Sequence, residues 1–99
     1  MSSIFGAIER NEIDKLRQIL AKGADPNQTL DESGVTPLHF AAQYNRPEVA
    51  QLLIEAGAEL EVRPEGDGDT ALEIAEMYGH LKVMQIISFY LNRDRMSEN

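Results

Sequence analysis

The sequence lacks cysteine and contains only two histidines among its 99 residues. The absence of cysteine excludes disulfides, thiol nucleophiles and zinc sites with cysteine ligands. No apolar run approaches the ~20 residues that a membrane-spanning helix needs, because Gln85 and Ser88 interrupt the longest one. The N-terminus also lacks the basic start and apolar stretch of a secretory signal. We therefore expect a single small cytoplasmic domain with no membrane contact.

Basic residues are also scarce, since nine stand against seventeen acidic ones and the formal net charge is −8. The imbalance is greatest between Glu55 and Glu76, where eight carboxylates share the segment with Arg63 alone. Such a surface repels a phosphate backbone, so we expect no direct binding of nucleic acid. A basic protein partner would be attracted to it, although negative charge can equally serve only to keep a small protein soluble.

A repeat of 34 residues runs through the chain. When the sequence is shifted by this interval, Ala7, Ala41 and Ala75 coincide, and Gly23 falls on Gly57. Apolar positions recur at the same spacing in two further sets: Leu16, Ala50 and Met84, and Ile19, Leu53 and Ile87. A fixed period of this length indicates a solenoid of stacked repeats.

Each unit is predicted to form two short helices followed by a long loop. In the second unit Thr36 is a natural N-cap, and Pro37 follows at the first helical position, where it needs no N–H. Asn45 can adopt the left-handed conformation that ends the first helix. The second helix is predicted to begin at Pro47, with apolar residues at i, i+3, i+4 spacing, and to stop at Gly57.

These motifs resemble the ankyrin repeat. Residues 36–42 read TPLHFAA, residues 47–53 read PEVAQLL, and Gly57-Ala58 follows; the ankyrin signature is T-P-L-H-x-A at a period of 33. The resemblance covers residues 4–91 and implies an all-α ankyrin-repeat solenoid of three stacked helix-turn-helix units with long acidic loops. The first unit departs from the signature, with Ser2-Ser3-Ile4-Phe5 in place of Thr-Pro-Leu-His.

The predicted domain comprises residues 1–91, and we expect a complete short array because about three repeats are needed for stability. Its units are placed at about 1–33, 34–67 and 68–91. The first and third units are predicted to act as polar caps; Glu76, for example, stands where the middle unit has Ala42. Residues 89–91 would prolong the last helix over the final groove, and the charged tail 92–99 is expected to fray.

Neither histidine is predicted to be catalytic or to bind metal. His39 lies three residues after Thr36, as Glu73 follows Thr70 in a T-x-x-E capping box. Because histidine and glutamate occupy the same position at equivalent helix starts, we expect this position to have a structural role. The resemblance implies that His39 fixes the turn. We interpret His80 in the same way. No second ligand lies at i+4 of either histidine and no serine lies in a nucleophile motif, so we predict no catalytic residue, cofactor or metal site.

The acidic stretch EGDGDTALE, residues 65–73, places oxygen side chains at alternate positions. An EF-hand loop that starts at Asp67 would need an oxygen ligand and a glycine where the chain has Ala71 and Leu72. We therefore interpret this stretch as a flexible acidic loop that binds cations weakly at most, with Gly66 and Gly68 permitting its turn.

The remaining candidate for function is a surface. The resemblance implies that partners are contacted by loop tips and by the outward side of each first helix. There, two columns recur at the repeat spacing: Glu9, Gln43 and Met77, and Arg10, Tyr44 and Tyr78. The predicted partner-binding residues are Arg10, Glu32, Ser33, Val35, Gln43, Tyr44, Asp67, Asp69, Met77 and Tyr78. Tyrosine and arginine are typical of binding hot spots, although the tyrosines can alternatively pack sideways on a neighbouring helix.

The sequence thus predicts a non-catalytic protein-binding module, monomeric when free, that binds its partner through its concave face and loop tips and acts by sequestration, inhibition or scaffolding. Its partner is expected to be a protein with basic character. Three narrower interpretations stay open: an immunity- or antidote-type inhibitor of a basic toxin or nuclease, a regulatory or stabilising subunit of an enzyme, and a metal-responsive acidic loop.

Overall fold

The computed structural model describes residues 3–96, and within that range it contains helices and loops but no strand. The elements are α1 (Ile4–Glu9), α2 (Ile13–Ala21), α3 (Pro37–Gln43), α4 (Pro47–Glu55), the 3-10 turn η1 (Pro64–Gly66), α5 (Ala71–Tyr78) and α6 (Leu81–Met96). The predicted all-α solenoid of three helical hairpins is confirmed.

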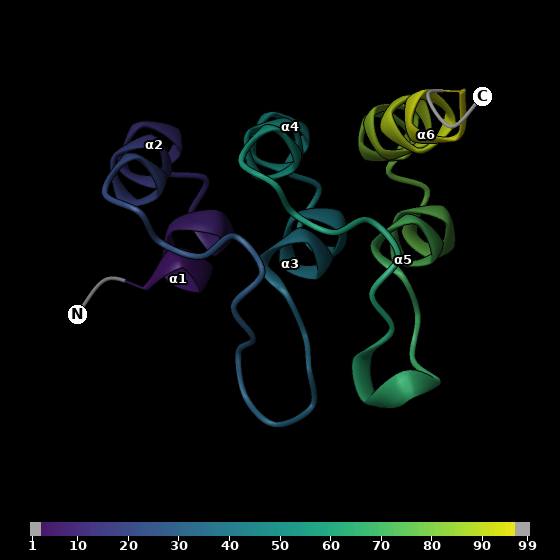
Figure 1. Cartoon of the computed structure of the whole chain (residues 1–99), viewed down its shortest axis with the longest axis horizontal. Helices are drawn as coiled ribbons and strands as arrows, with labels where there is room; N and C mark the ends of the chain where they lie inside the picture. The colour runs from purple at the N-terminus through teal and green to yellow at the C-terminus, as the bar shows by residue number, and fades with distance from the viewer. Residues whose placement is uncertain (1–2, 97–99) are drawn as a thin grey trace.

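The helices lie in two rows (Figure 1). Helices α1, α3 and α5 form the first row, and α2, α4 and α6 form the second, with contacts between successive members of each row. The loops that follow α2 and α4 project beyond the first row, below α3 and α5 in the view of Figure 1. The result is an elongated stack of 41 × 26 × 23 Å, in which each unit packs on its neighbour along the chain.

Helix starts follow the predicted capping chemistry. The Thr36 hydroxyl accepts from the backbone N–H of His39, and the Thr70 hydroxyl accepts from that of Glu73, so both capping boxes are present. In the first unit the cap is Ser3, whose hydroxyl accepts from the N–H of Gly6. This cap lies one residue later than the repeat alignment with Thr36 indicates.

The ends of the first-row helices also agree with the sequence. Asn45, predicted to be left-handed, has a φ value of 57°, and the equivalent residues Gly79 and Asn11 have the same conformation with φ values of 71° and 56°. Asparagine tolerates this region better than other residues that carry a Cβ. Each of these positions therefore reverses the chain from the first helix of a unit into the second.

Helix α6 is longer than its counterparts, with 16 residues against nine in α2 and nine in α4. Glycines with positive φ, Gly23 and Gly57, follow α2 and α4, whereas Leu91 occupies the equivalent position and lets α6 continue. The helix thus extends beyond residue 91, where a frayed tail was predicted, and residues 97–99 lie outside the described residues. The Phe89 side chain is 59% exposed, so it does not cover the end of the stack as predicted.

The core lies between the two rows of helices. Its largest fully buried apolar side chains are Ile8, Leu16, Leu38, Val49, Leu53, Val83 and Ile87. The aligned alanines Ala7, Ala41 and Ala75 are also buried, because a small side chain allows successive first-row helices to approach closely. Repeat positions that are apolar in all three units therefore form one continuous core.

Neighbouring units are also joined by hydrogen bonds at equivalent positions. Arg46 donates from Nε to the carbonyl of Ile8 at 3.1 Å and from Nη2 to that of Glu9 at 2.6 Å. One repeat later, His80 Nδ1 donates to the carbonyl of Ala42 at 2.7 Å. Both side chains thus satisfy carbonyls at the C-terminal end of the preceding unit's first helix, which have no partner within that helix.

Candidate protein-binding surface

Tyr44 lies at the C-terminal end of α3, where its side chain is 37% exposed. One side of its ring rests on Phe40, with centroids 5.5 Å apart. Phe40 in turn makes an edge-on contact with Phe5 of the first unit at 4.9 Å. The ring is therefore at the surface and leans on an aromatic pair, a contact within its own helix that the sequence analysis did not identify. The i, i+4 spacing of Phe40 and Tyr44 is the signal that was available.

Tyr78 occupies the equivalent place in the third unit, as the last residue of α5, and is 56% exposed. Its ring stacks on that of His80, with centroids 5.8 Å apart and an interplanar angle of 23°. His80 is fixed by its partly buried hydrogen bond to the Ala42 carbonyl, so a backbone contact orients the exposed ring of Tyr78. Neighbouring Met77 is also exposed. Neither tyrosine is buried in the interior.

Arg10 completes this column as the C-cap of α1, and its guanidinium lies 4.0 Å from the Glu12 carboxylate. Gln43 is exposed at the end of α3. Since α1, α3 and α5 lie side by side in one row (Figure 1), these residues and the two tyrosines sit at the same end of three neighbouring helices. We call Arg10, Gln43, Tyr44, Met77 and Tyr78 the tyrosine surface.

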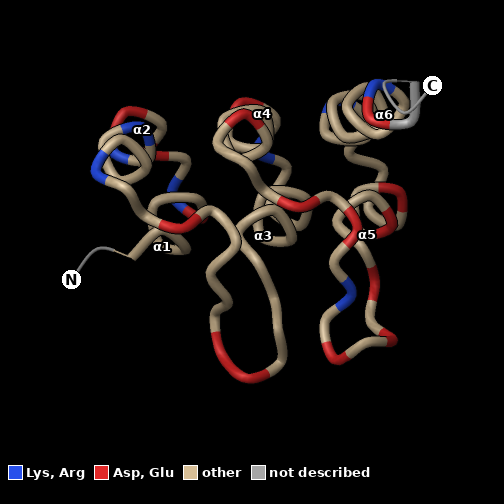
Figure 2. The backbone as a smooth tube through the Cα atoms, in the orientation of Figure 1, with Lys and Arg blue, Asp and Glu red and all other residues tan. Residues whose placement is uncertain are grey.

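The predicted loop-tip residues lie at the opposite ends of these helices. Glu32, Asp67 and Asp69 are exposed, and the loops carry their acidic residues at and near their tips (Figure 2). A helix of seven residues spans about 10 Å, so the loop tips and the tyrosine surface bracket the length of α3 rather than forming one cluster. Leu30, in the loop between α2 and α3, also has an exposed side chain. Sequence analysis did not identify it as a surface residue.

Two of the predicted loop residues contribute less free surface than expected. Ser33 is half-buried, and both its hydroxyl and its backbone N–H donate to the Asp31 carboxylate. These hydrogen bonds lower the pKa of Asp31 from its ordinary value. Val35 is also half-buried, and its carbonyl accepts from the N–H of Leu30 at 2.9 Å, which closes the loop. Local turn bonding thus shapes the loop and uses the polar groups of Ser33.

His39 is buried, with 2% of its surface exposed, and joins the second unit to the third. Its Nε2 lies 3.0 Å from the carbonyl of Val62 and 3.1 Å from that of Asp69. Because carbonyls only accept, the ring proton is on Nε2, and Nδ1 accepts from the N–H and hydroxyl of Thr36. The ring therefore performs the predicted capping role and also holds both ends of the acidic loop between α4 and α5.

Burial lowers the pKa of His39 from its ordinary value near 6.5, and the hydrogen bonds to the Val62 and Asp69 carbonyls offset this only in part. The unfolded chain therefore takes up a proton at this residue before the native state does, as the pH falls below about 6.5. Stability should be constant with respect to this group above that pH and should decrease below it.

We accordingly expect the urea midpoint to decrease between about pH 7 and about pH 5.5, the interval in which an ordinary histidine titrates. Denaturation followed by circular dichroism at closely spaced pH values would measure it. In His39→Gln, which keeps an acceptor for Thr36, the decrease over this interval should become smaller. An unchanged pH profile in that variant would contradict the assignment to His39.

The acidic loop between α4 and α5 is held by Arg63. Its guanidinium pairs with the Glu73 carboxylate at 2.8 and 3.2 Å and also donates to the carbonyl of Gly68 at 3.0 Å. Arg63, together with the Thr70 N–H, lowers the pKa of Glu73. A Cβ on Gly68 would lie 2.7 Å from the carbonyl oxygen of Pro64, so glycine is required at this turn.

Residues 3–96 contain neither a metal-binding cluster nor a membrane-spanning helix. No group of three or more histidine and acidic side chains in this range is arranged to hold a metal ion. In the same part of the chain, no helix has the length and apolarity to cross a membrane.

The helical hairpins, the inter-unit hydrogen bonds and the outward-facing helix ends define a helical repeat protein. A family model for ankyrin repeats matches residues 4–94 in three copies. The chain therefore belongs to the ankyrin repeat family, as its motifs predicted. Ankyrin repeats generally mediate contacts between proteins and have no catalytic chemistry of their own.

Similar proteins carry comparable segments within much longer chains. The sequence is 40% identical to 2-5A-dependent ribonuclease of Mus musculus over 59% of this chain, and 36% identical to neurogenic locus Notch protein of Drosophila melanogaster over 81%. It is 31% identical to dauer abnormal formation protein 25 of Caenorhabditis elegans over 95%. The chain spans 8%, 3% and 24% of the length of these relatives, respectively. The similarity thus concerns the repeat segment.

Proposed function

We propose that this chain binds a protein partner with basic character through the tyrosine surface, and that the loop carboxylates assist the encounter. The observation that carries the proposal is the support beneath each exposed tyrosine. Tyr44 rests on Phe40, and Tyr78 is stacked on a histidine that is itself hydrogen-bonded to the backbone. Rings held in this way lose little conformational entropy on binding, which is the property that makes tyrosine an effective anchor.

The charge distribution supports a basic partner. Acidic residues dominate the two long loops, and a single arginine lies in the loop between α4 and α5 (Figure 2). Carboxylates at the rim of an interface chiefly accelerate encounter with a positively charged protein. The acidic loops therefore attract the partner, and the tyrosine surface supplies most of the affinity.

Binding of this kind acts by sequestration, inhibition or scaffolding. Inhibition of a basic toxin or nuclease, and regulation of a catalytic partner as its subunit, are the two narrower roles consistent with the acidic loops. A monomeric free state and a cytoplasmic location stay predictions. A catalytic role for the repeat segment itself is not proposed, because His39 and His80 are both engaged with backbone carbonyls.

The test compares affinity capture from native cell extract by the unaltered chain and by Tyr44→Ala/Tyr78→Ala. We expect a partner, quantified by mass spectrometry, to be retained about tenfold less by the double variant, because each anchor contributes on the order of 1 kcal/mol or more. Retention should also fall when salt is raised from about 0.1 M to about 0.5 M, which screens the loop charges.

The matched control is Phe89→Ala, which removes an exposed aromatic ring from the second row of helices. This variant should retain the partner as the unaltered chain does, and circular dichroism should show all three proteins folded. Equal retention by the chain and its double-tyrosine variant would refute the proposed surface.

A further inference from the structure

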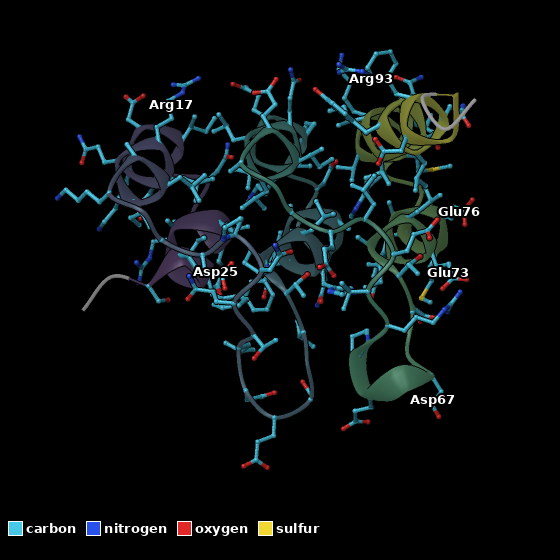
Figure 3. The ribbon with its side chains drawn as sticks, viewed as in Figure 1. Arg17, Asp25, Asp67, Glu73, Glu76 and Arg93 are labelled. Carbon is cyan, nitrogen blue, oxygen red and sulfur yellow. The ribbon has the colours of Figure 1, made fainter. Side chains whose placement is uncertain are left out.

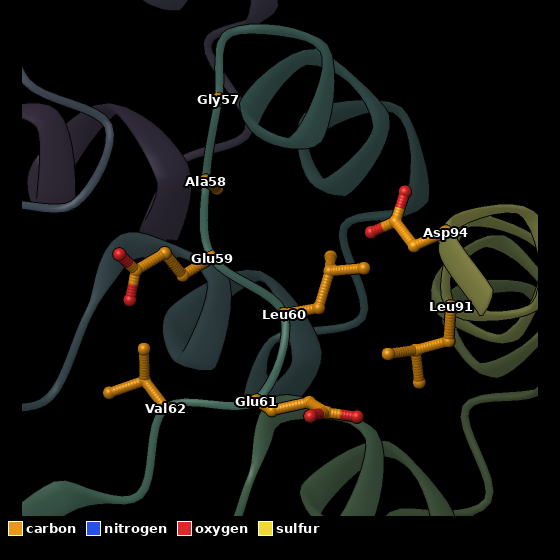
Figure 4. Close-up of a pocket in the computed structure, with 8 residues that line it drawn as sticks. All are labelled: Gly57, Ala58, Glu59, Leu60, Glu61, Val62, Leu91 and Asp94. Carbon is orange, nitrogen blue, oxygen red and sulfur yellow. The ribbon is translucent and has the colours of Figure 1, made fainter. Parts of the chain in front are cut away.

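A groove lies between the chain segment 57–62 and helix α6 (Figure 4). Its main hollow of about 760 Å³ is lined by this segment together with Leu91 and Asp94 of α6. A second hollow of about 420 Å³ shares Leu60, Glu61 and Leu91 with the first and continues to Leu72 on α5. The two form one trough along the side of the third unit, separate from the tyrosine surface at the end of the first-row helices.

The equivalent place one unit earlier is filled by the chain itself. Asn27, which aligns with Glu61, donates to the carbonyl of Gly57 at 3.0 Å and accepts from the N–H of Glu59 at 2.8 Å. The chain after α4 thus turns at Gly57 and runs beside the preceding unit's loop. In the third unit Leu91 stands where that glycine stands, and α6 continues as a helix through this point. Within residues 3–96, the third unit therefore has no counterpart of the extended segment 57–62.

The side chains of the groove indicate which segment would fit. An asparagine amide donates and accepts, as the Gly57 and Glu59 backbone groups require, whereas the Glu61 carboxylate only accepts and carries a negative charge. Apolar contact area is supplied by Leu60, Leu72 and Leu91. The ligand should therefore carry N–H donors, cationic side chains and some apolar side chains.

Charge in the groove has one predominant sign. Its acidic residues are Glu59, Glu61, Glu73, Glu76 and Asp94. Arg63 is the basic residue among those lining the two hollows, and its guanidinium is held by Glu73 and the Gly68 carbonyl. Arg93 lines an adjoining hollow of about 470 Å³ together with Asp94, and its guanidinium lies near the Tyr90 ring. Glu73 and Glu76 extend from α5 away from the stack (Figure 3). Such a rim favours a cationic partner and repels an acidic one.

We propose that this groove binds an extended basic segment of a partner protein, laid beside residues 57–62 as those residues lie beside the preceding loop. Alternate side chains of an extended segment point to opposite sides. Apolar residues of the segment therefore contact the leucines, and its lysines or arginines reach the carboxylates. This site is independent of the tyrosine surface, so either proposal can fail alone.

Fluorescence anisotropy with a labelled heptapeptide of alternating lysine and leucine tests the proposal. We expect saturable binding to the intact chain and none of a counterpart with glutamate in place of lysine. Glu59→Gln/Glu76→Gln should weaken binding at least about fivefold, because it removes two exposed carboxylates from the groove. Tyr44→Ala/Tyr78→Ala should leave it unchanged, which separates this site from the tyrosine surface.

The matched control is Asp14→Asn/Glu48→Gln, which changes the net charge equally at exposed positions of α2 and α4. An equal loss of affinity in both double variants would show general attraction between charges and would overturn the site. Amide chemical shifts on peptide addition should change at residues 57–62 and 91–94. Shifts confined to the tyrosine surface, or self-association of the free chain that uses this groove, would also overturn it.

Discussion

Replacing His39 with alanine is expected to lower the free energy of unfolding by about 3 kcal/mol, as inferred from the loss of a buried side chain and of its hydrogen bonds. The substitution leaves the buried N–H of Thr36 without its acceptor and the carbonyls of Val62 and Asp69 without their donor. It also opens a cavity between the second and third units, since the ring is fully enclosed. Urea denaturation followed by circular dichroism measures the loss.

Glu73→Ala provides the comparison, because Glu73 occupies the same repeat position in the third unit. Its carboxylate caps α5 and pairs with Arg63, but it is partly exposed. Its removal should destabilise the fold much less, because the freed groups can be hydrated. Equal losses in the two variants would mean that His39 serves only as a helix cap and does not join the units.

The sequence was sufficient to predict the fold because the repeat period and the helix-capping residues agree with each other. Thr36 and Thr70 begin helices, Asn45 and Gly79 end them, and the aligned alanines are buried. Each of these effects is local, so residue type and spacing were enough to identify it. Agreement across three units then determined how the helices stack.

Features that depend on contacts between units were harder to predict. Arg46 and His80 make equivalent hydrogen bonds to the preceding unit, yet the two residue types share little except a donor nitrogen. The extension of α6 follows from Leu91 replacing a terminating glycine. The repeat alignment contained this substitution, but the helix was expected to end there and the tail 92–99 to fray. The groove beside α6 could not be predicted without that extension.

In the candidate binding surface, too, some features followed from local sequence and others depended on contacts between units. Exposure of Tyr44 and Tyr78 followed from their place in the repeat. Their support by Phe40 and His80 required the packed structure, because it depends on ring orientation and on a hydrogen bond across units. Sequence alone also overstated the contribution of Ser33, whose polar groups are used within its own loop.

Replacing Ala42 with glutamate should have the largest effect of any substitution considered, with a loss of more than about 4 kcal/mol. Ala42 is 0% exposed, lies where α3 faces α5, and its carbonyl binds His80. A carboxylate at this position would be buried without a cationic partner, or would separate the third unit from the second. Since domains of this size have a total stability of roughly 5–15 kcal/mol, most of the helical signal should be lost at low urea concentration.

The natural chain provides the control at the equivalent position of the third unit, where it already has a glutamate. Glu76 is exposed and points away from α3 (Figure 3), so Glu76→Ala should change the urea midpoint little, because surface substitutions usually have small effects. Glutamate in place of alanine is thus expected to be strongly destabilising at position 42, which the third unit covers. At the equivalent position 76, which is exposed, the choice between the two residues should matter little. If Ala42→Glu retains the unaltered midpoint, the close contact between α3 and α5, and with it the stacked arrangement that places Tyr44 beside Tyr78, would be refuted.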